Sequence, residues 1–313
     1  LEATSGISRM MWGTGVHNSH ILGVVSLACS DYEFPLLIGD IANDLAGKVE
    51  IRERQTIDAG AGSTVNTLTY KTADYMLSSA QDYRPGGRGD SEHIWQATLG
   101  HEAVVFANHP ACMSEDGAHR PGFWLGNQTL PRVAQWKDVL IAVHRLPDDD
   151  WMGFTHAYFP TLMFSEYENR RNHRVKGEAW AFARKDNAFL ALTAARSLDL
   201  VQHAPDGYRE LRSIGKENIW LCHMGSVATD GSFDKFKKRI LAMKVEWQPL
   251  AVSLKSLRGE QLTFGWEGPL RVNGMEQAIT GFKHHESPYG SAEFPARQMD
   301  VQFGGTLLRL DFS

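Results

Sequence analysis

The sequence has few cysteines, and nothing in their spacing suggests that they pair. Only Cys29, Cys112 and Cys222 occur among 313 residues; they lie far apart, and no CxxC pair is present. An odd number of widely spaced cysteines predicts neither a disulfide framework nor a compact zinc knuckle. The chain is therefore expected to gain its stability from an apolar core.

The sequence also lacks the features that direct a chain to a membrane or to nucleic acid. No apolar run approaches the roughly 18 residues of a membrane-spanning helix, and no basic, apolar and small-residue signal peptide opens the chain. The formal net charge is −5, which indicates no basic face for nucleic acid. Because the chain starts at Leu1 rather than Met, a processed or truncated product is one interpretation, and the native location stays open.

Trp and His are the residues that the sequence has in number. Nine Trp and thirteen His occur in a chain that is 42% hydrophobic, a composition typical of a globular protein with a sizeable core. A Trp ring offers a flat apolar face that suits the CH face of a sugar ring. The alternative is that most of these rings simply fill the core.

Residues 1–55 are interpreted as a helical lead segment of two or three short helices. Pro35 suits the first turn of a helix, Leu37, Ile41 and Leu45 fall on one face, and Gly47 can end it. Too few residues remain for these helices to enclose a core alone. We expect them to be the end of a helical domain, or a collar packed on the β domain that comes after them.

Residues 56–313 are interpreted as one large antiparallel β-sandwich domain, which makes the chain mainly β. Short β runs at 139–146, 179–184 and 188–194 are separated by turn residues, and Asn273-Gly274 and Gly304-Gly305 mark further tight turns. Connections this short exclude βαβ crossovers. One helix interrupts the pattern, capped by Ser232 and carrying an apolar stripe that begins at Phe233.

The stretch 81–136 is the most informative for function, because Gly and Pro make it rich in loops, and loops on a rigid sheet often carry binding groups. Its polar candidates are Tyr83, Arg84, His93, Gln96, His109, His119, Arg120, Asn127 and Arg132, and its aromatic candidates are Trp95, Trp124 and Trp136. We expect these side chains to converge at one rim of the sandwich. The alternative is that the loops hydrogen-bond one another and only stiffen the fold.

This mixture of residue types fits β-elimination on a uronic-acid glycan. Arg and Asn would neutralise the sugar carboxylate and so lower the cost of a carbanion at C5, while a Tyr or His removes the C5 proton and another protonates the departing oxygen. The candidates for these proton transfers are Tyr75, Tyr83, His93, His109 and His119.

Two other chemistries remain open on the same loops. A glycoside hydrolase would need two carboxylates across a sugar, and Asp82, Asp90, Glu92, Glu115 and Asp116 are available. A divalent metal, zinc or calcium, would need ligands of the kind that His109, His119 and Asp116 supply, with Cys112 and Glu115 nearby. Their spacing matches no compact zinc signature.

Four stretches of this sequence carry a resemblance to a known family. They are SLACSDY at 26–32, YKTADYMLSSAQ at 70–81, EHIWQATLG at 92–100 and NHP at 108–110. Together they resemble heparinase II/III-like proteins, which are polysaccharide-lyase-type chains with an α/α toroid followed by an antiparallel β-sandwich. The resemblance covers nearly the whole chain, and 26–32 is similar to the last helix before the sandwich.

The resemblance implies a polysaccharide lyase that binds a polysaccharide or oligosaccharide in a cleft between toroid and sandwich, with His93 and His109 as cleft residues. This chain is too short for a complete toroid, so the alternatives of a glycoside hydrolase or a non-catalytic glycan-binding or scaffold module stay open. Without a toroid, the apolar residues of 8–45, beginning with Met10, Met11 and Trp12, would lose their cover. We therefore expect self-association, or a helical partner chain, through residues 8–45.

Overall fold

The computed structural model describes residues 29–31, 33–44, 47–57, 63–90, 92–100, 102–113, 121–124, 126–171, 179–203 and 207–312. Within them strands far outnumber helices, and the strand pairs are antiparallel. The predicted mainly-β, antiparallel fold class is thus confirmed. No helix in these ranges is long and apolar enough to cross a membrane.

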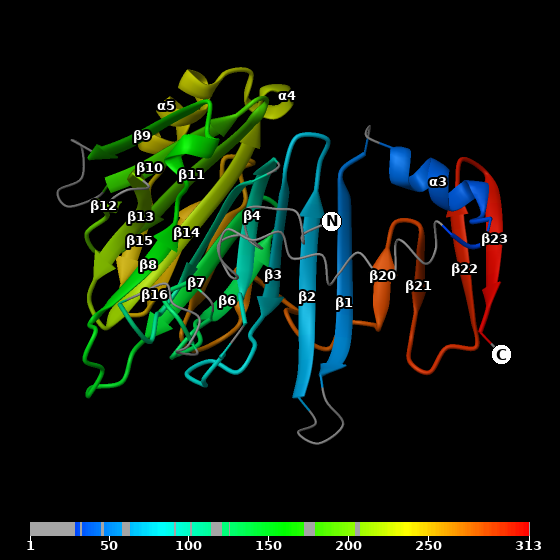
Figure 1. Cartoon of the computed structure of the whole chain (residues 1–313), viewed down its shortest axis with the longest axis horizontal. Coiled ribbons are helices and arrows are strands. Elements are labelled where there is room, and N and C mark those ends of the chain that lie inside the picture. Colours follow the sequence, from blue (N-terminus) through cyan, green and yellow to red (C-terminus); the bar gives the residue numbers. More distant parts are fainter. Residues whose placement is uncertain are drawn as a thin grey trace.

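The largest sheet has ten strands (Figure 1). In spatial order they are β12 (Asp199–His203), β13 (Gly207–Ile214), β8 (Phe154–Tyr158), β5 (Ala103–Asn108), β4 (Trp95–Gly100), β3 (Met76–Gln81), β2 (Ser63–Lys71), β1 (Val49–Ile57), β20 (His285–Ser287) and β21 (Gly290–Ala292). The strands from β1 to β5 follow chain order, because consecutive antiparallel strands can pair directly, joined by turns or, between β3 and β4, by the longer loop 82–94.

Two further sheets stack behind it, and a hairpin lies beside it. The six-stranded sheet runs β6 (Arg132–Trp136), β7 (Val139–Arg145), β14 (Glu217–Ser226), β11 (Ala188–Ala194), β10 (Ala179–Lys185) and β9 (Glu166–Arg171). The five-stranded sheet runs β15 (Val245–Gln248), β16 (Ala251–Lys255), β17 (Gln261–Gly265), β18 (Leu270–Val272) and β19 (Met275–Gln277), and the hairpin pairs β22 (Gln298–Phe303) with β23 (Thr306–Asp311).

The inner strands of the six-stranded sheet are buried on both faces, which the sequence did not predict. On β14, Trp220 and Cys222 belong to the core shared with the ten-stranded sheet, while Ile219 and Leu221 belong to the core shared with the five-stranded sheet. This explains the near-continuous apolar runs of β7, β11 and β14, because a strand covered on both faces needs no polar alternation. The sandwich therefore has a third layer.

The helices are short and lie at the margins. α5 (Phe233–Ala242) packs Phe233, Phe236 and Ile240 into the core between the six-stranded and five-stranded sheets, which we call the second core. Ser232 accepts a hydrogen bond from Lys235 N and so caps the helix as predicted. This helix follows α4 (Val227–Asp230), and a single 3-10 turn, η2, covers Thr161–Met163.

The lead segment differs from its prediction in two respects. α3 (Leu36–Asn43) ends with Asp44 as its cap, before the expected Gly47, and only Leu37 is buried. β1 begins at Val49, so the end of the range 1–55 is strand. The other expected helices of the lead segment lie in residues 1–28, outside the described residues.

Three predicted hairpin turns are confirmed. Lys185 pairs with Ala188, Val272 with Met275, and Phe303 with Thr306, so each turn has two residues. Asn273 and Gly274 both have positive φ, as the mirror-image turns of right-twisted hairpins require.

A polar contact crosses the core between the ten-stranded and six-stranded sheets, which we call the first core. This contact offers a test of the layer arrangement. Thr155 Oγ1 of β8 accepts hydrogen bonds from Trp220 Nε1 at 2.8 Å and Asn218 Nδ2 at 3.1 Å, and all three residues are buried. Thr155→Val keeps the shape but leaves two buried donors without this acceptor. We expect a loss of about 1–3 kcal/mol in the free energy of unfolding, measured by denaturant titration.

Thr263→Val is the matched control, since Thr263 is exposed on β17. A change of within about 0.5 kcal/mol is expected there. Equal effects of the two substitutions would contradict the buried role of Thr155.

Candidate functional site

The loops of 82–94 and 109–131 meet at one end of the ten-stranded sheet. Gly89 and Asn127 exchange backbone hydrogen bonds of 2.8 and 2.6 Å. The Asn127 side chain donates to Glu92 O at 2.9 Å and accepts from His109 N at 3.0 Å. The described parts of the two loops therefore meet, and Asn127 is the buried residue that joins them.

Glycine is required where these loops cross. A Cβ on Gly126 would lie 2.3 Å from Gly89 O, and one on Gly89 would lie 2.6 Å from Glu92 Oε2 and from Leu130 Cδ2. At Gly126 the close atom belongs to the backbone, so a larger side chain would require the backbone to move, whereas at Gly89 the close atoms belong to side chains. The hydrogen bond from Asn127 Nδ2 fixes the backbone of Glu92 at this crossing.

Three side chains form a polar cluster on the first of these loops, which we call the rim cluster: Tyr83, Arg84 and Glu92. Tyr83 OH donates to Glu92 Oε1 at 3.2 Å, and Arg84 Nη1 donates to the same hydroxyl at 3.4 Å. Arg84 lies 3.9 Å from Glu92, and nearly half of its side chain is exposed. The phenol ring is buried, so the cluster presents the guanidinium outward and keeps the hydroxyl behind it.

His93 follows directly and is half-buried. Its ring stacks on Phe106 with centroids 4.2 Å apart, and Nε2 lies 2.6 Å from Trp124 O. A carbonyl only accepts, so Nε2 carries the proton and Nδ1 keeps a lone pair in the neutral ring. Burial lowers the pKa of His93, partly offset by that hydrogen bond, and so favours the neutral ring.

His109 lies inside the fold. Its side chain is fully buried, with Nε2 at 3.0 Å from Asp150 Oδ1, although the two groups are not aligned as a hydrogen bond. Burial lowers the pKa of His109 to about 4, against the opposing effect of Asp150. In this arrangement its imidazole contacts protein rather than a surface ligand, while its backbone N–H and C=O bond Asn127 Oδ1 and Gln128 N and so support the loops.

Other predicted contacts are also internal. Trp95 and Trp124 are each 2% exposed, Trp95 in the first core and Trp124 in a small cluster with Phe106 and Tyr158. Arg132 donates to both carboxylate oxygens of Asp82 and to the carbonyls of residues 265 and 266. These three side chains stabilise this part of the sandwich, as expected if the loops only stiffen the fold.

Gln96 remains at the surface. It lies on β4, donates to Thr98 Oγ1 at 2.9 Å, and is directly opposite Ser78 of β3. Both are partly exposed. Gln96, Thr98 and Ser78 thus form a small polar patch on the face of the sheet opposite to Trp95 and Ala97, which belong to the core.

Three predicted residues cannot be placed. Asp116, His119 and Arg120 lie outside the described residues, as does Glu115. Among the residues that are described, no group of three His, Cys, Asp or Glu side chains could hold a metal ion. The predicted zinc or calcium site therefore stays a prediction that depends on the undescribed stretch 114–120.

A network below the loops was not predicted. His156 Nδ1 lies 3.0 Å from Glu210 Oε1, its Nε2 lies 2.8 Å from Phe123 O, and the Trp124 indole stacks on its ring at 4.0 Å. Burial would raise the pKa of Glu210, but hydrogen bonds from His156 and Arg212 lower it to about 2. No local motif signals this pairing, because β8 and β13 are brought together only by the sheet.

The chain matches no protein-family model, and no curated protein matches it either.

The buried histidines give a pH dependence. Burial lowers the pKa of His109 to about 4 and of His144 and His223 to about 3, well below about 6.5 for an unfolded His. Between these values the unfolded chain binds more protons than the folded chain. Stability is therefore fully present above pH 6.5 and is lost as the pH falls, by up to about 1.4 kcal/mol per pH unit for each histidine.

Denaturant titration between pH 7 and pH 5 measures this loss. His144→Leu removes one titrating group whose ring nitrogens are buried without hydrogen-bond partners, so the slope of stability against pH should become shallower. A native protein equally stable at pH 7 and pH 5 would be incompatible with these buried neutral rings.

Proposed function

We propose that this chain is the β-sandwich part of a carbohydrate-active enzyme, and specifically of a polysaccharide lyase that cleaves uronic-acid glycans by β-elimination. The observation that carries the proposal is the rim cluster. An exposed guanidinium, a phenol hydroxyl and a carboxylate lie within 4 Å of one another, and His93 is the next residue along the chain, with its ring stacked on Phe106. The resemblance to heparinase II/III-like proteins supports the same reaction class.

Each group has a role in this proposal. Arg84 pairs with the uronate carboxylate and so stabilises the negative charge that develops at C5. Neutral His93 accepts the C5 proton at Nδ1, and Tyr83 donates its proton to the oxygen that leaves C4. The C4–O bond breaks and a C4–C5 double bond forms. Glu92, hydrogen-bonded to the phenol, orients it.

A non-catalytic glycan-binding or scaffold module is a second candidate, and a specific observation favours it. Asn127 and Arg132 are engaged in internal hydrogen bonds, and Trp95 and Trp124 are buried. Loops of that kind stiffen a sandwich without any reaction. The two candidates differ in turnover, not in binding.

Ultraviolet absorbance of an unsaturated product, after incubation with uronate polymers, tests the lyase proposal. Tyr83→Phe keeps the buried ring but removes the proton donor, and should lower turnover by about 10²–10⁴-fold. Arg84→Ala should also lower it by removing the carboxylate partner. Arg88→Ala is the matched control, because this exposed arginine of the same loop pairs with Asp90 instead.

The assay measures unsaturated product, reducing ends and glycan binding on this chain. Bound glycan without unsaturated product or new reducing ends would favour the module. New reducing ends without unsaturation would favour a glycoside hydrolase. Full activity in Tyr83→Phe would remove the rim cluster from the reaction.

The helical lead segment exposes apolar side chains that could contact another chain. Phe34, Leu36 and Ile38 are 58%, 83% and 37% exposed around α3; the other residues proposed for contact, 8–28, are outside the described residues. We expect the isolated chain to self-associate through this segment or to bind a helical partner chain. Light scattering at tens of micromolar should show a larger species, reduced in Leu36→Ser. A clean monomer would contradict an uncovered apolar lead.

A further inference from the structure

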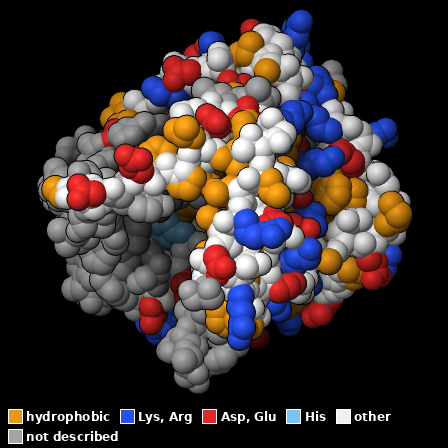
Figure 2. Space-filling view, turned by 90° about the vertical axis from the view of Figure 1, so that its right-hand side faces the viewer, with side chains coloured by type: hydrophobic (Ala, Val, Ile, Leu, Met, Phe, Trp, Pro, Cys, Tyr) orange, Lys and Arg blue, Asp and Glu red, His pale blue; other side chains and the backbone are white. Residues whose placement is uncertain are grey.

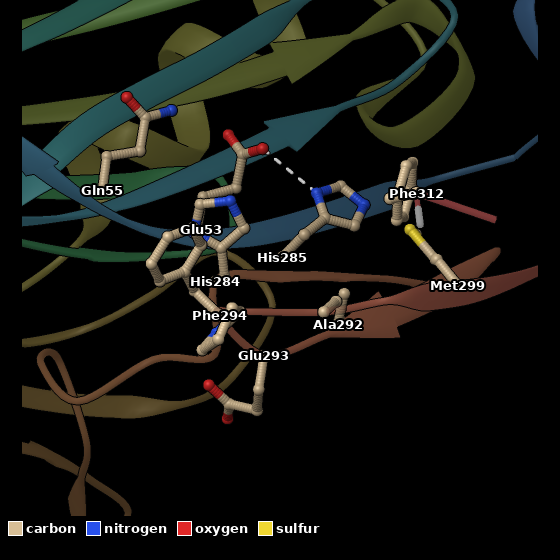
Figure 3. A pocket seen from close by; sticks show the side chains of 11 residues that line it. Glu53, Gln55, His284, His285, Ala292, Glu293, Phe294, Met299 and Phe312 are labelled. Atoms are coloured by element: carbon tan, nitrogen blue, oxygen red, sulfur yellow. Dashed lines mark hydrogen bonds and ion pairs between the residues drawn. The ribbon is translucent and has the colours of Figure 1, made fainter. Parts of the chain in front are cut away.

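A groove of about 690 Å³ lies at the other margin of the ten-stranded sheet, between β1, β20 and the β22–β23 hairpin (Figure 3). Its volume is within the range of small-molecule sites. Glu53 and Gln55 of β1 line one side, His284 and His285 lie beside them, and the segment from 293 to 296 closes the other side. None of these residues was a predicted site residue.

The polar groups of the groove are oriented by their neighbours. His285 Nδ1 lies 3.1 Å from Glu53 Oε1, and its Nε2 lies 3.2 Å from Ser287 Oγ. His284 Nδ1 lies 3.1 Å from Arg54 O. That carbonyl can only accept, so Nδ1 carries the proton and Nε2 of His284 keeps a lone pair. Glu53 and His284 thus supply acceptors for a ligand that donates.

Aromatic side chains stand beside these acceptors. Phe294 is 75% exposed, and its ring centre is 5.6 Å from that of His284; Phe312, on the other side, is 58% exposed. Figure 3 shows the two phenylalanines flanking the Glu53–His285 pair. Figure 2 looks onto this end of the molecule, where hydrophobic side chains lie among charged ones and histidine is visible only deep in a hollow. A sugar ring, with one apolar CH face and a hydroxyl rim, matches such a wall.

The charge of the lining selects among sugars. Two lining residues, Glu53 and Glu293, are carboxylates, and none of the described residues that line the groove is Lys or Arg. The nearby Arg54 is hydrogen-bonded to Glu293 at 3.0 Å. A uronate or sulfated unit would therefore meet like charge from this lining, whereas hydroxyl and ammonium groups would meet acceptors.

We propose that this groove is a glycan-binding subsite for a sugar unit without an acidic group, either neutral or amino-bearing. Binding at the groove does not depend on the lyase reaction. Cross-strand pairing places it on the same sheet face as Gln96: Glu53 pairs with Thr67, Thr69 with Ser78, and Ser78 with Gln96. β20 and β4 are four strand spacings apart in the sheet, or roughly 19 Å.

One consequence does rest on the proposed function. If the rim cluster takes the acidic unit of a glycan, the groove takes a non-acidic unit of the same chain some distance along it. A mixed glycan would then bind more tightly than either homopolymer, because the two contacts are linked.

Calorimetric titration of the full chain with three defined oligosaccharides tests the groove: a cello-oligosaccharide, a glucosamine oligomer and a galacturonate oligomer. The first two should bind, the glucosamine oligomer at least as tightly as the neutral one. Phe294→Ala and Glu53→Gln should each weaken this binding by about tenfold or more, the size of one lost stacking contact or charge-assisted hydrogen bond. Trp151→Ala, which removes a 63% exposed aromatic side chain elsewhere, is the matched control and should have no effect.

Three results would overturn the proposal: no binding of either non-acidic oligomer, equally tight binding of galacturonate that depends on Phe294, or an effect of Trp151→Ala as large as that of Phe294→Ala. Tyr83→Phe separates the two sites. It should leave binding of the non-acidic oligomers unchanged. A chain without lyase activity can therefore still bind these oligomers at the groove, and a chain that does not bind them can still be a lyase.

Discussion

The inner strands of the six-stranded sheet have neither face in contact with water, and the rest of the molecule is arranged to keep it so. The ten-stranded sheet covers one face and the five-stranded sheet, with α5, covers the other. Alternate residues of a single strand, such as Trp220 and Leu221, therefore belong to different cores. At about 25 cal/mol per Å² of apolar surface, this double burial is the dominant favourable contribution to folding. It also makes the ten-stranded sheet a rigid support for the loops at its end.

The polar groups near the outer face divide into two kinds. Asn108, Asn127 and His156 are buried and hydrogen-bond backbone carbonyls or N–H groups of the loops, so that they fix loop positions. Arg84 and Gln96 retain exposed polar atoms. A catalytic site needs both kinds, since a reactive group is useful only when its neighbours hold it in place. Internal hydrogen bonds in the same loops are therefore compatible with a catalytic role for the rim cluster.

Local patterns were sufficient for part of the fold. The cap at Ser232 and the turn at Asn273-Gly274 each depend on residues within a few positions, and both are observed. The third layer was not predicted, because a short apolar run such as that of β7 does not show which element covers its second face, and a buried helical segment gives a similar run. The end of α3 was also misjudged: Gly47 can cap a helix, but the chain leaves the helix at Asp44 and enters β1 at Val49.

The candidate site was predicted in composition more than in arrangement. Gly and Pro in the stretch 81–136 marked the loops between β3 and β4 and between β5 and β6. Which of their side chains face outward could not be predicted, because burial of Trp95, Trp124 and His109 depends on strands far away in sequence. The groove was missed for the same reason, since Glu53 and His285 are brought together only by the pairing of β1 with β20.

Hydrogen–deuterium exchange of the chain with and without a saturating uronate oligosaccharide tests whether the rim cluster binds the acidic sugar, because it locates the contact without requiring turnover. We expect slower exchange in the loops of 82–94 and 126–131, abolished by Arg84→Ala but not by Arg88→Ala. Protection confined to other parts of the molecule, or unchanged in Arg84→Ala, would contradict the assignment of the rim cluster as the site that takes the acidic sugar.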